Sequence, residues 1–197
     1  MQVETAARYA GPASVLVSLG GTLAATVASP SFSWTANALS ELGVVETAAG
    51  TETTLLLFNP GLVAGGLLGL GFAWYLVRTA PATGWRATGV VFGLTAAAMG
   101  GVGRFPMDQP LHGPVAIAFF LGISGTLALA GRAGIREGSR RYGLASLLGA
   151  VAHLAGWVGW LLAGGPEALG LALPELWGSV LLAGWVLLTA RRRGGGR

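Results

Sequence analysis

Six long apolar stretches follow one another along the chain, separated by short segments that hold most of its charged residues. Each stretch is close to the roughly 20 residues that an α-helix needs to cross the hydrocarbon core of a membrane. The pattern therefore predicts an all-α fold, a polytopic transmembrane bundle of six helices in a single domain over residues 1–197. The predicted helices span approximately residues 9–28, 54–77, 87–104, 111–131, 142–163 and 174–190.

The arginines predict how this bundle is oriented. With six crossings, eleven of the twelve arginines fall on one side, namely Arg8, Arg78, Arg86, Arg132, Arg136, Arg140, Arg141, Arg191, Arg192, Arg193 and Arg197. Basic loops resist translocation, so this side is predicted to be the cytoplasm, with the N- and C-termini on it. Arg104 falls on the outer side, together with Glu41, Glu46, Glu52, Asp108, Glu167 and Glu175.

Composition agrees with a membrane protein and excludes several kinds of site. The chain is 53% hydrophobic and 10% charged, with a mean hydropathy of +0.65, whereas a soluble domain is about 25% charged. It has no cysteine, which excludes disulfides, thiolate catalysis and cysteine-ligated metal sites. The pI of 10.7 comes from arginines at helix ends, so we expect no nucleic-acid binding.

The basic residues also bear on the source of the protein. All twelve are arginine and none is lysine, a bias typical of a GC-rich genome. We therefore expect a prokaryote, either a GC-rich bacterium or a haloarchaeon, and a multi-pass protein of its cell membrane.

Three features carry polar residues near the outer ends of the predicted helices. Residues 34–43 mix apolar and polar positions, which favours a small helix at the membrane interface. Asn59 precedes Pro60 inside the second helix, where its amide can satisfy the backbone carbonyl that the proline frees. Residues 103–112 connect the third and fourth helices.

We expect ligand-binding residues among these polar side chains. Arg104 is placed near the hydrocarbon boundary, where an arginine needs an anionic partner, either Asp108, Glu41 or a lipid headgroup. A structural alternative for Asp108 is that it caps the fourth helix. The predicted ligand-binding set is Asn37, Glu41, Asn59, Arg104, Asp108 and His112.

One chemical hypothesis for this region is catalysis by a serine. Activation of a serine hydroxyl needs a nucleophile, a base and an acid that orients the base. Ser40, His112 and Asp108 are residues of these three types. The structural alternative is that Ser40 forms a turn or cap, which is the commoner role of a loop serine.

A second hypothesis is a metal site built from the fourth, fifth and sixth helices, with Asp108, His112, His153 and Glu175 as candidate ligands. His153 is predicted near the middle of its helix, about a dozen ångströms below the outer residues at roughly 1.5 Å per residue. We therefore expect His153 to bond a serine or carbonyl of a neighbouring helix, and we predict no metal site. The residues do not identify a cofactor.

Short motifs on the outer side resemble those of a known family. They are Asn37-x-x-Ser40-x-Leu42-Gly43 after the first helix, Phe105-Pro106-x-Asp108 after the third, and His112 shortly beyond. In motif order and helix number the chain resembles the family known as domain of unknown function 998. The resemblance implies a six-helix membrane protein with a polar outer face, and it implies no activity.

Three classes of function fit this pattern. The first is a protein that binds or modifies a lipid or lipid-linked headgroup, with membrane lipids as partners and Arg104 on an anionic headgroup. The second is a small transporter or channel, although the inner halves of the helices offer few polar residues beyond Asn59 and His153. The third is a structural subunit that associates with itself or with another membrane protein through glycine-rich faces such as residues 64–71.

The predicted orientation can be tested with single cysteines in this cysteine-free chain. Cysteines placed at Ser33 and Glu167 should react with a membrane-impermeant maleimide added to intact cells, and one at Gly138 should react only after the membrane is opened. The reverse labelling pattern would show that the termini lie outside.

Overall fold

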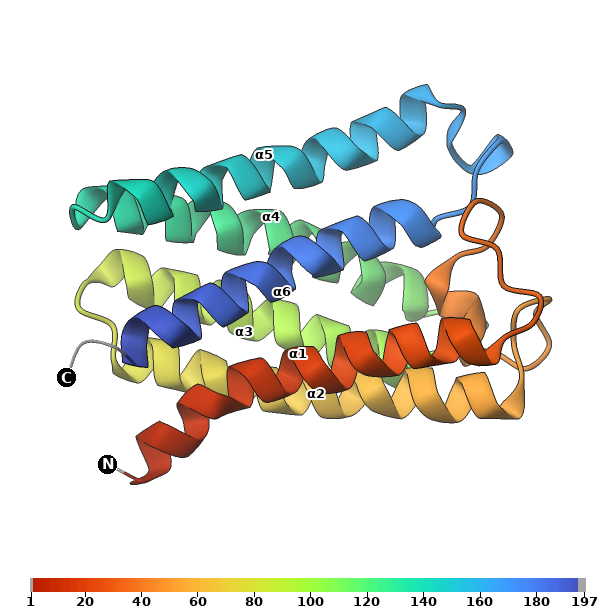
Figure 1. Cartoon of the computed structure of the whole chain (residues 1–197), viewed down its shortest axis with the longest axis horizontal. Coiled ribbons are helices and arrows are strands. Elements are labelled where there is room, and N and C mark those ends of the chain that lie inside the picture. Colours follow the sequence, from red (N-terminus) through yellow and green to blue (C-terminus); the bar gives the residue numbers. More distant parts are fainter. Residues whose placement is uncertain (1, 195–197) are drawn as a thin grey trace.

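Six long α-helices form the protein, whose structure is a computed structural model that describes residues 2–194 (Figure 1). The described residues contain no β-strand, so the predicted all-α fold class is confirmed. In chain order the elements are α1 (Gln2–Ala28), the 3-10 helix η1 (Leu39–Gly43), α2 (Glu52–Arg78), α3 (Thr83–Arg104), α4 (His112–Arg136), α5 (Arg140–Leu162), the 3-10 helix η2 (Gly165–Glu167) and α6 (Ala172–Gly194).

The helices extend past the predicted apolar ranges at most of their ends. α1 begins at Gln2 rather than at residue 9, and α4 runs to Arg136 rather than to residue 131. Arginines occupy the last turns of α2, α4 and α6, where their long side chains can reach water from a helix end close to the membrane. The hydropathy pattern therefore locates each helix and underestimates its length.

Five of the described helices are long and apolar enough to cross a membrane, namely α1 over Val3–Ala28, α2, α4, α5, and α6 over Ala172–Arg193. α3 has 22 residues but is less apolar, because glycine, threonine and Arg86 occupy many of its positions. It packs between α2 and α4. The chain is thus a multi-pass membrane protein, and α3 is flanked by two of the helices that can cross the membrane.

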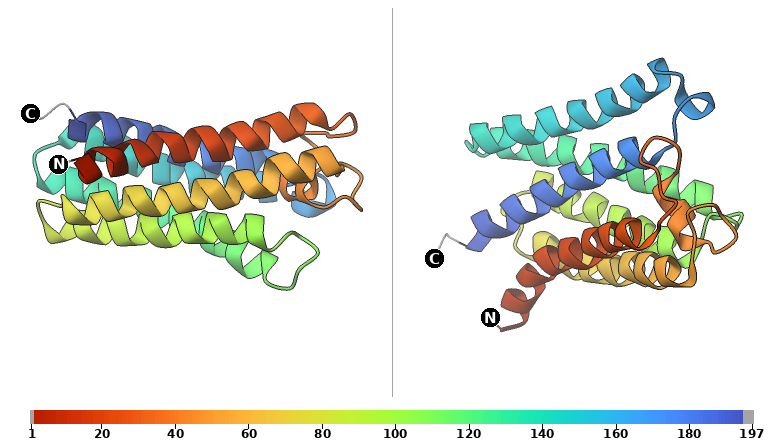
Figure 2. Two further views of the ribbon diagram at one scale, coloured as in Figure 1. Left: turned by 90° about the horizontal axis from the view of Figure 1, so that it is seen from below. Right: turned by 45° about the vertical axis from the view of Figure 1, so that its right-hand side comes forward.

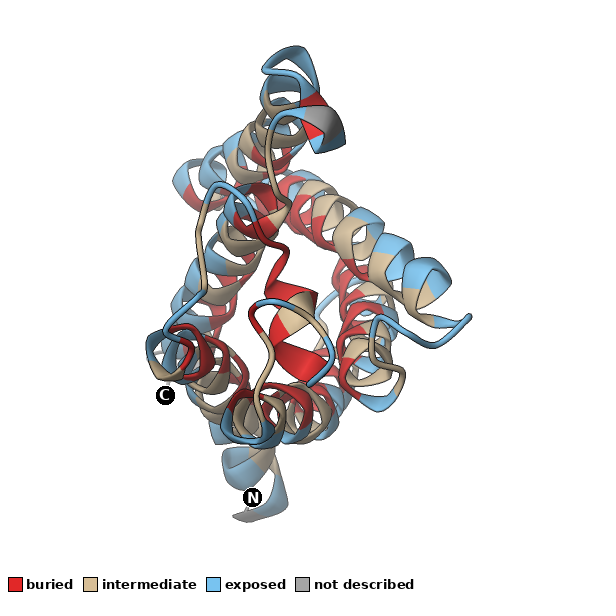
Figure 3. Cartoon of the chain, turned by 90° about the vertical axis from the view of Figure 1, so that its right-hand side faces the viewer, coloured by how far each residue is buried: buried red, intermediate tan, exposed pale blue. Residues whose placement is uncertain are grey.

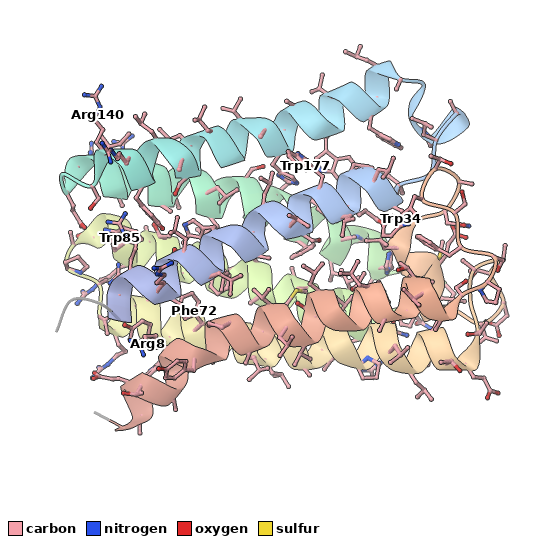
Figure 4. The ribbon with its side chains drawn as sticks, viewed as in Figure 1. Arg8, Trp34, Phe72, Trp85, Arg140 and Trp177 are labelled. Atoms are coloured by element: carbon pink, nitrogen blue, oxygen red, sulfur yellow. The ribbon has the colours of Figure 1, made fainter. Side chains whose placement is uncertain are left out.

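Each long helix packs against the next one in the chain, and α6 closes the arrangement by contacting α1, α4 and α5 (Figure 1 and Figure 2). Both termini lie at the same end of the bundle. That end also carries Arg8 and Arg140 and is called the arginine end below (Figure 4). The opposite end is called the η1 end, and the compartment that each end faces remains a prediction.

Small residues let the backbones of neighbouring helices approach closely. A Cβ atom added to Gly66 of α2 would lie 2.8 Å from the Cα of Gly100 in α3. One added to Gly61 would lie 3.5 Å from the Cα of Gly21 in α1. The glycine-rich face of α2 is therefore occupied inside the bundle, so a partner helix would have to use another face.

The last turn of α6 holds the arginine end together. Arg193 donates a hydrogen bond to the carbonyl of Thr79 (3.0 Å), and its guanidinium lies 4.5 Å from the ring centre of Trp85. Arg192 donates to Ser139 Oγ (2.8 Å). These contacts fasten the α2–α3 and α4–α5 loops to α6.

α4 and α5 touch at the arginine end and diverge toward the η1 end (Figure 1 and Figure 2). At the arginine end a Cβ added to Gly134 of α4 would lie 3.2 Å from the Cα of Gly143 in α5. Nearer the η1 end, the rings of Phe120 and Trp157 stand between the two helices, with centres 5.1 Å apart. The two helices therefore form a V that opens toward η1.

Gly66→Ala should destabilise the bundle, because the added methyl group would meet backbone atoms of Ala96 and Gly100. Overpacking of this kind costs about 1–3 kcal/mol, so denaturant titration in detergent should show a lower free energy of unfolding. Gly20→Ala is the matched control, since nothing lies within 4 Å of a Cβ added to Gly20. Equal stability of the two variants would contradict the close packing of α2 on α3.

Candidate functional site

η1 lies within the ring of helix ends (Figure 3). Its buried residues are Leu39, Ser40, Leu42 and Gly43. The sequence predicted a short helix here, at the membrane interface. The short helix is present but enters the bundle, because Leu39 and Leu42 pack into a hydrophobic cluster that includes Phe58. Ser40 is carried inward with them.

Asn37 and Glu41 hold η1 in shape locally. The two oxygens of Glu41 accept hydrogen bonds from the Asn37 amide (2.7 Å) and from the backbone N–H of Ala38 (2.7 Å). The Oδ1 of Asn37 accepts the backbone N–H of Ser33 (2.8 Å). Both side chains therefore stabilise η1 and the turn before it.

Two helices anchor the ends of η1. The Asn59 amide of α2 donates to the carbonyl of Gly43 (2.9 Å), and a carboxylate oxygen of Glu175 in α6 accepts the backbone N–H of Leu39 (2.7 Å). The prediction that Asn59 bonds the carbonyl freed by Pro60 is wrong. Because residue 43 is glycine, η1 can approach α2 closely, and a Cβ added there would collide with Asn59. The Asn59 amide therefore bonds the carbonyl of Gly43 in η1 and not the carbonyl freed by Pro60.

A central cavity of about 80 Å³ extends from η1 into the bundle between α1, α2, α3, α4 and α6. Hydroxyl groups of α1 line one wall, at Ser14, Ser18 and Thr22. The lining also includes Phe92 and Val186, which belong to the main hydrophobic core. The cavity is therefore blind toward the arginine end.

A larger hollow, the lateral groove, has a volume of about 640 Å³ and lies where α4 and α5 diverge. Its lining is mostly apolar. Ile117, Leu121 and Leu154 in this lining are 63%, 64% and 50% exposed, so the groove opens to the outside of the bundle. In a membrane that side faces the lipid chains.

Three polar side chains line both hollows, namely Ser40 of η1, His112 of α4 and Glu175 of α6. We call them the polar junction. Ser40 is only 8% exposed, and its hydroxyl has no hydrogen-bond partner within residues 2–194. The polar junction thus stands where the small central cavity meets the larger lateral groove.

His112 is oriented by the loop that precedes α4. Its Nδ1 lies 2.8 Å from the carbonyl oxygen of Phe105, and because a carbonyl can only accept, Nδ1 carries the proton of this bond. In the neutral ring Nε2 is then a hydrogen-bond acceptor. No residue in the described part of the chain donates to it.

His153 of α5 is fully buried and also lines the lateral groove. Its Nδ1 lies 2.8 Å from Ser124 Oγ on α4, and its Nε2 accepts the indole N–H of Trp157 (3.1 Å). The prediction that His153 bonds a serine of a neighbouring helix is confirmed. The ring also packs against Gly178 of α6, so it joins three helices.

Residues 12–192 match the model of a family described as "Protein of unknown function (DUF998)". The chain belongs to the DUF998 family. No curated protein and no solved structure matches it.

In this DUF998 chain the motifs that suggested the family are brought to one end of the bundle. Residues 37–43 form η1 and the turn before it, and Phe105 fixes the ring of His112. The motif serine, Ser40, and the motif histidine, His112, meet at the polar junction.

Arg104 and Asp108 lie apart from the polar junction. Arg104 is exposed, its guanidinium lies 5.6 Å from the ring centre of Phe105, and among the described residues it forms no ion pair with Asp108 or Glu41. Asp108 is also exposed and caps no described helix, since the residue before α4 is Leu111. Neither residue lines the central cavity or the lateral groove.

These positions bear on the two chemical hypotheses for the DUF998 chain. Ser40 and His112 share the polar junction, but Phe105 rather than Asp108 bonds the ring of His112. For a metal, no three histidine, aspartate or glutamate side chains within residues 2–194 form a group that could hold an ion. His112 and Glu175 share the polar junction, whereas both ring nitrogens of His153 are already bonded.

Two groups of residues that line the site were not predicted from the sequence as ligand-binding residues. Ser14, Ser18 and Thr22 line the central cavity, and their spacing of four residues on α1 was the available signal. The sequence suggests Glu175 only as a candidate metal ligand. Its place beside η1 had no local signal, because 136 positions separate it from Leu39.

Asn59→Ala should loosen η1, because the Gly43 carbonyl would lose its donor, and a buried group left unpaired costs about 1–3 kcal/mol. Hydrogen–deuterium exchange in detergent should become faster in peptides over residues 38–44 and change little elsewhere. Ser146→Ala is the control, since Ser146 lies in α5 and its hydroxyl donates to the carbonyl of Tyr142 in the same helix. Unchanged exchange in Asn59→Ala would show that this anchor is not needed.

Proposed function

We propose that this DUF998 protein binds a lipid or a lipid-linked molecule, with the headgroup at the polar junction and the chains in the lateral groove. The observation that supports this most directly is the shared lining, since Ser40, His112 and Glu175 border both the central cavity and the mostly apolar lateral groove. A molecule with a polar end at these three side chains and a long apolar part in the groove has the form of a lipid.

The size and position of the lateral groove support a lipid chain as its occupant. Its volume of about 640 Å³ is within the range of roughly 300–1,000 Å³ that is usual for ligand sites. Exposed side chains such as Leu121 and Leu154 border it. A lipid can therefore enter sideways from the membrane without crossing the ring of helices.

A transport path through the bundle has weaker support. Ser14, Ser18 and Thr22 of α1 line the central cavity, but each hydroxyl already donates to a backbone carbonyl. Beyond the cavity, the ring centres of Phe72 and Phe92 lie 5.7 Å apart and those of Phe92 and Trp185 lie 5.5 Å apart. Packed aromatic rings thus fill the bundle where a path would continue, and the blind cavity suits water or the tip of a headgroup.

The polar junction also contains residue types used in acyl transfer. Ser40 has a hydroxyl, and Nε2 of His112 can accept a proton. Within the described chain no hydrogen bond joins the two residues, and no carboxylate orients the His112 ring. We therefore propose binding rather than hydrolysis.

Gly113→Trp should close the lateral groove without straining the fold. Gly113 lines the groove and nothing lies within 4 Å of a Cβ added to it, so the indole would occupy the place of the lipid. Native mass spectrometry of the purified protein should show roughly tenfold less bound lipid than in the wild type, a difference of about 1.4 kcal/mol.

The matched control is Gly159→Trp. Gly159 lies on α5, is exposed, also has nothing within 4 Å of an added Cβ, and does not line the groove. It should retain lipid like the wild type. Equal lipid in the two tryptophan variants, or a wild-type protein without bound lipid, would contradict binding in the groove and favour a structural subunit.

A further inference from the structure

We infer that the headgroup bound at the polar junction carries an ammonium group that donates hydrogen bonds, as the headgroup of phosphatidylethanolamine does. This inference rests on the proposed function and names the chemistry of the ligand at the same site. It departs from the expectation, drawn from Arg104 in the sequence, that the headgroup is anionic.

The polar junction offers mainly hydrogen-bond acceptors. One carboxylate oxygen of Glu175 accepts the backbone N–H of Leu39 (2.7 Å), and its second oxygen has no partner in the described chain. The Nδ1 of His112 is used by the Phe105 carbonyl, which leaves Nε2 as an acceptor in the neutral ring. With the oxygen of Ser40, three acceptors are available to a ligand.

Ser40 indicates that this space is built for a polar partner. More than nine-tenths of the residue is buried, yet its hydroxyl is bonded to no described residue, and it lines both hollows. The hydroxyl itself is not enclosed by protein atoms but opens onto the hollows, so the polar end of a ligand can reach it.

The charge of the site favours a cation. Glu175 accepts the N–H of Leu39 and Glu41 accepts the N–H of Ala38, so both carboxyl groups lie at the start of η1, and within residues 2–194 neither is paired with an arginine. Arg104 lies at the same end of the bundle but outside both hollows. A phosphate at the polar junction would be repelled by these carboxylates, whereas an ammonium would be attracted.

The number of donors also fits. A primary ammonium has three N–H donors, and the polar junction has three unoccupied acceptors. Hydrogen bonds between an ionised donor and a carboxylate are stronger than those between neutral groups. A quaternary ammonium has the charge without the donors, so it would satisfy Glu175 electrostatically and leave Ser40 and His112 unpaired.

Three lipids with identical acyl chains separate charge from hydrogen bonding. Phosphatidylethanolamine has a primary ammonium, phosphatidylcholine has a quaternary ammonium without N–H groups, and phosphatidylethanol has the same phosphate without an amine. The protein is exposed to equal amounts of the three in mixed micelles, and bound lipid is measured by native mass spectrometry. The wild type should retain phosphatidylethanolamine roughly tenfold over phosphatidylethanol, with phosphatidylcholine between them.

Glu175→Gln is the decisive variant, because glutamine keeps an oxygen for the Leu39 N–H and removes the charge. It should lower the preference for phosphatidylethanolamine roughly tenfold, to near equality with phosphatidylethanol. Glu52→Gln, at an exposed position at the start of α2, should leave the preference unchanged. If Glu175→Gln does not fold, Ser40→Ala removes one acceptor and should reduce the preference severalfold.

The outcomes separate this inference from the proposed function. Lipid binding that Gly113→Trp abolishes, but with no preference among the three headgroups, would overturn the inference and leave lipid binding in place. A preference for phosphatidylethanol, or one that Glu175→Gln and Ser40→Ala leave unchanged, would overturn it as well. Lipid retention that is unaffected by Gly113→Trp would contradict the proposed function and the inference together.

Discussion

Peptide groups inside a membrane protein must find hydrogen-bond partners within the protein, because lipid offers none. The long helices meet this requirement through their own backbones. η1 does not, because so short a 3-10 helix leaves N–H and C=O groups unpaired at its ends. Asn59 and Glu175 reach from α2 and α6 to supply those partners. The polar character of the η1 end is therefore linked to the insertion of η1, a short 3-10 helix, into the bundle.

The groove beside η1 follows from where the helices can approach. Glycines bring α4 and α5 together at the arginine end, where Gly134 meets Gly143. Nearer the η1 end, Phe120 and Trp157 hold the same helices apart, while His153 keeps α5 tied to Ser124 of α4. One pair of helices thus has a tight end and an open end, and the open end lies next to Ser40 and Glu175. The site therefore has a polar part, the polar junction, and an apolar part, the lateral groove between the diverging helices.

Charge is distributed unequally between the two ends of the bundle. At the arginine end, guanidinium groups bond loop residues and lie over aromatic rings, as Arg193 does with Thr79 and Trp85. At the η1 end, Glu41 and Glu175 surround a short helix and have no arginine beside them within residues 2–194. The arginines therefore hold the loops of the arginine end to α6, whereas the two carboxyl groups of the η1 end bond η1 and the turn before it.

Hydropathy was enough to locate the six helices, because crossing a membrane is a local property of about 20 consecutive residues. The helix count also placed the motif residues Ser40 and His112 at the same end of the bundle, where the structure has them. Which side chains meet there was decided only by the folded chain. Asp108 turns out to be exposed while a backbone carbonyl bonds His112, and Glu175 reaches η1 across 136 positions. Such contacts depend on loop conformation and on the rotation of each helix about its axis. Both depend on side-chain packing throughout the bundle, which no short stretch of sequence specifies.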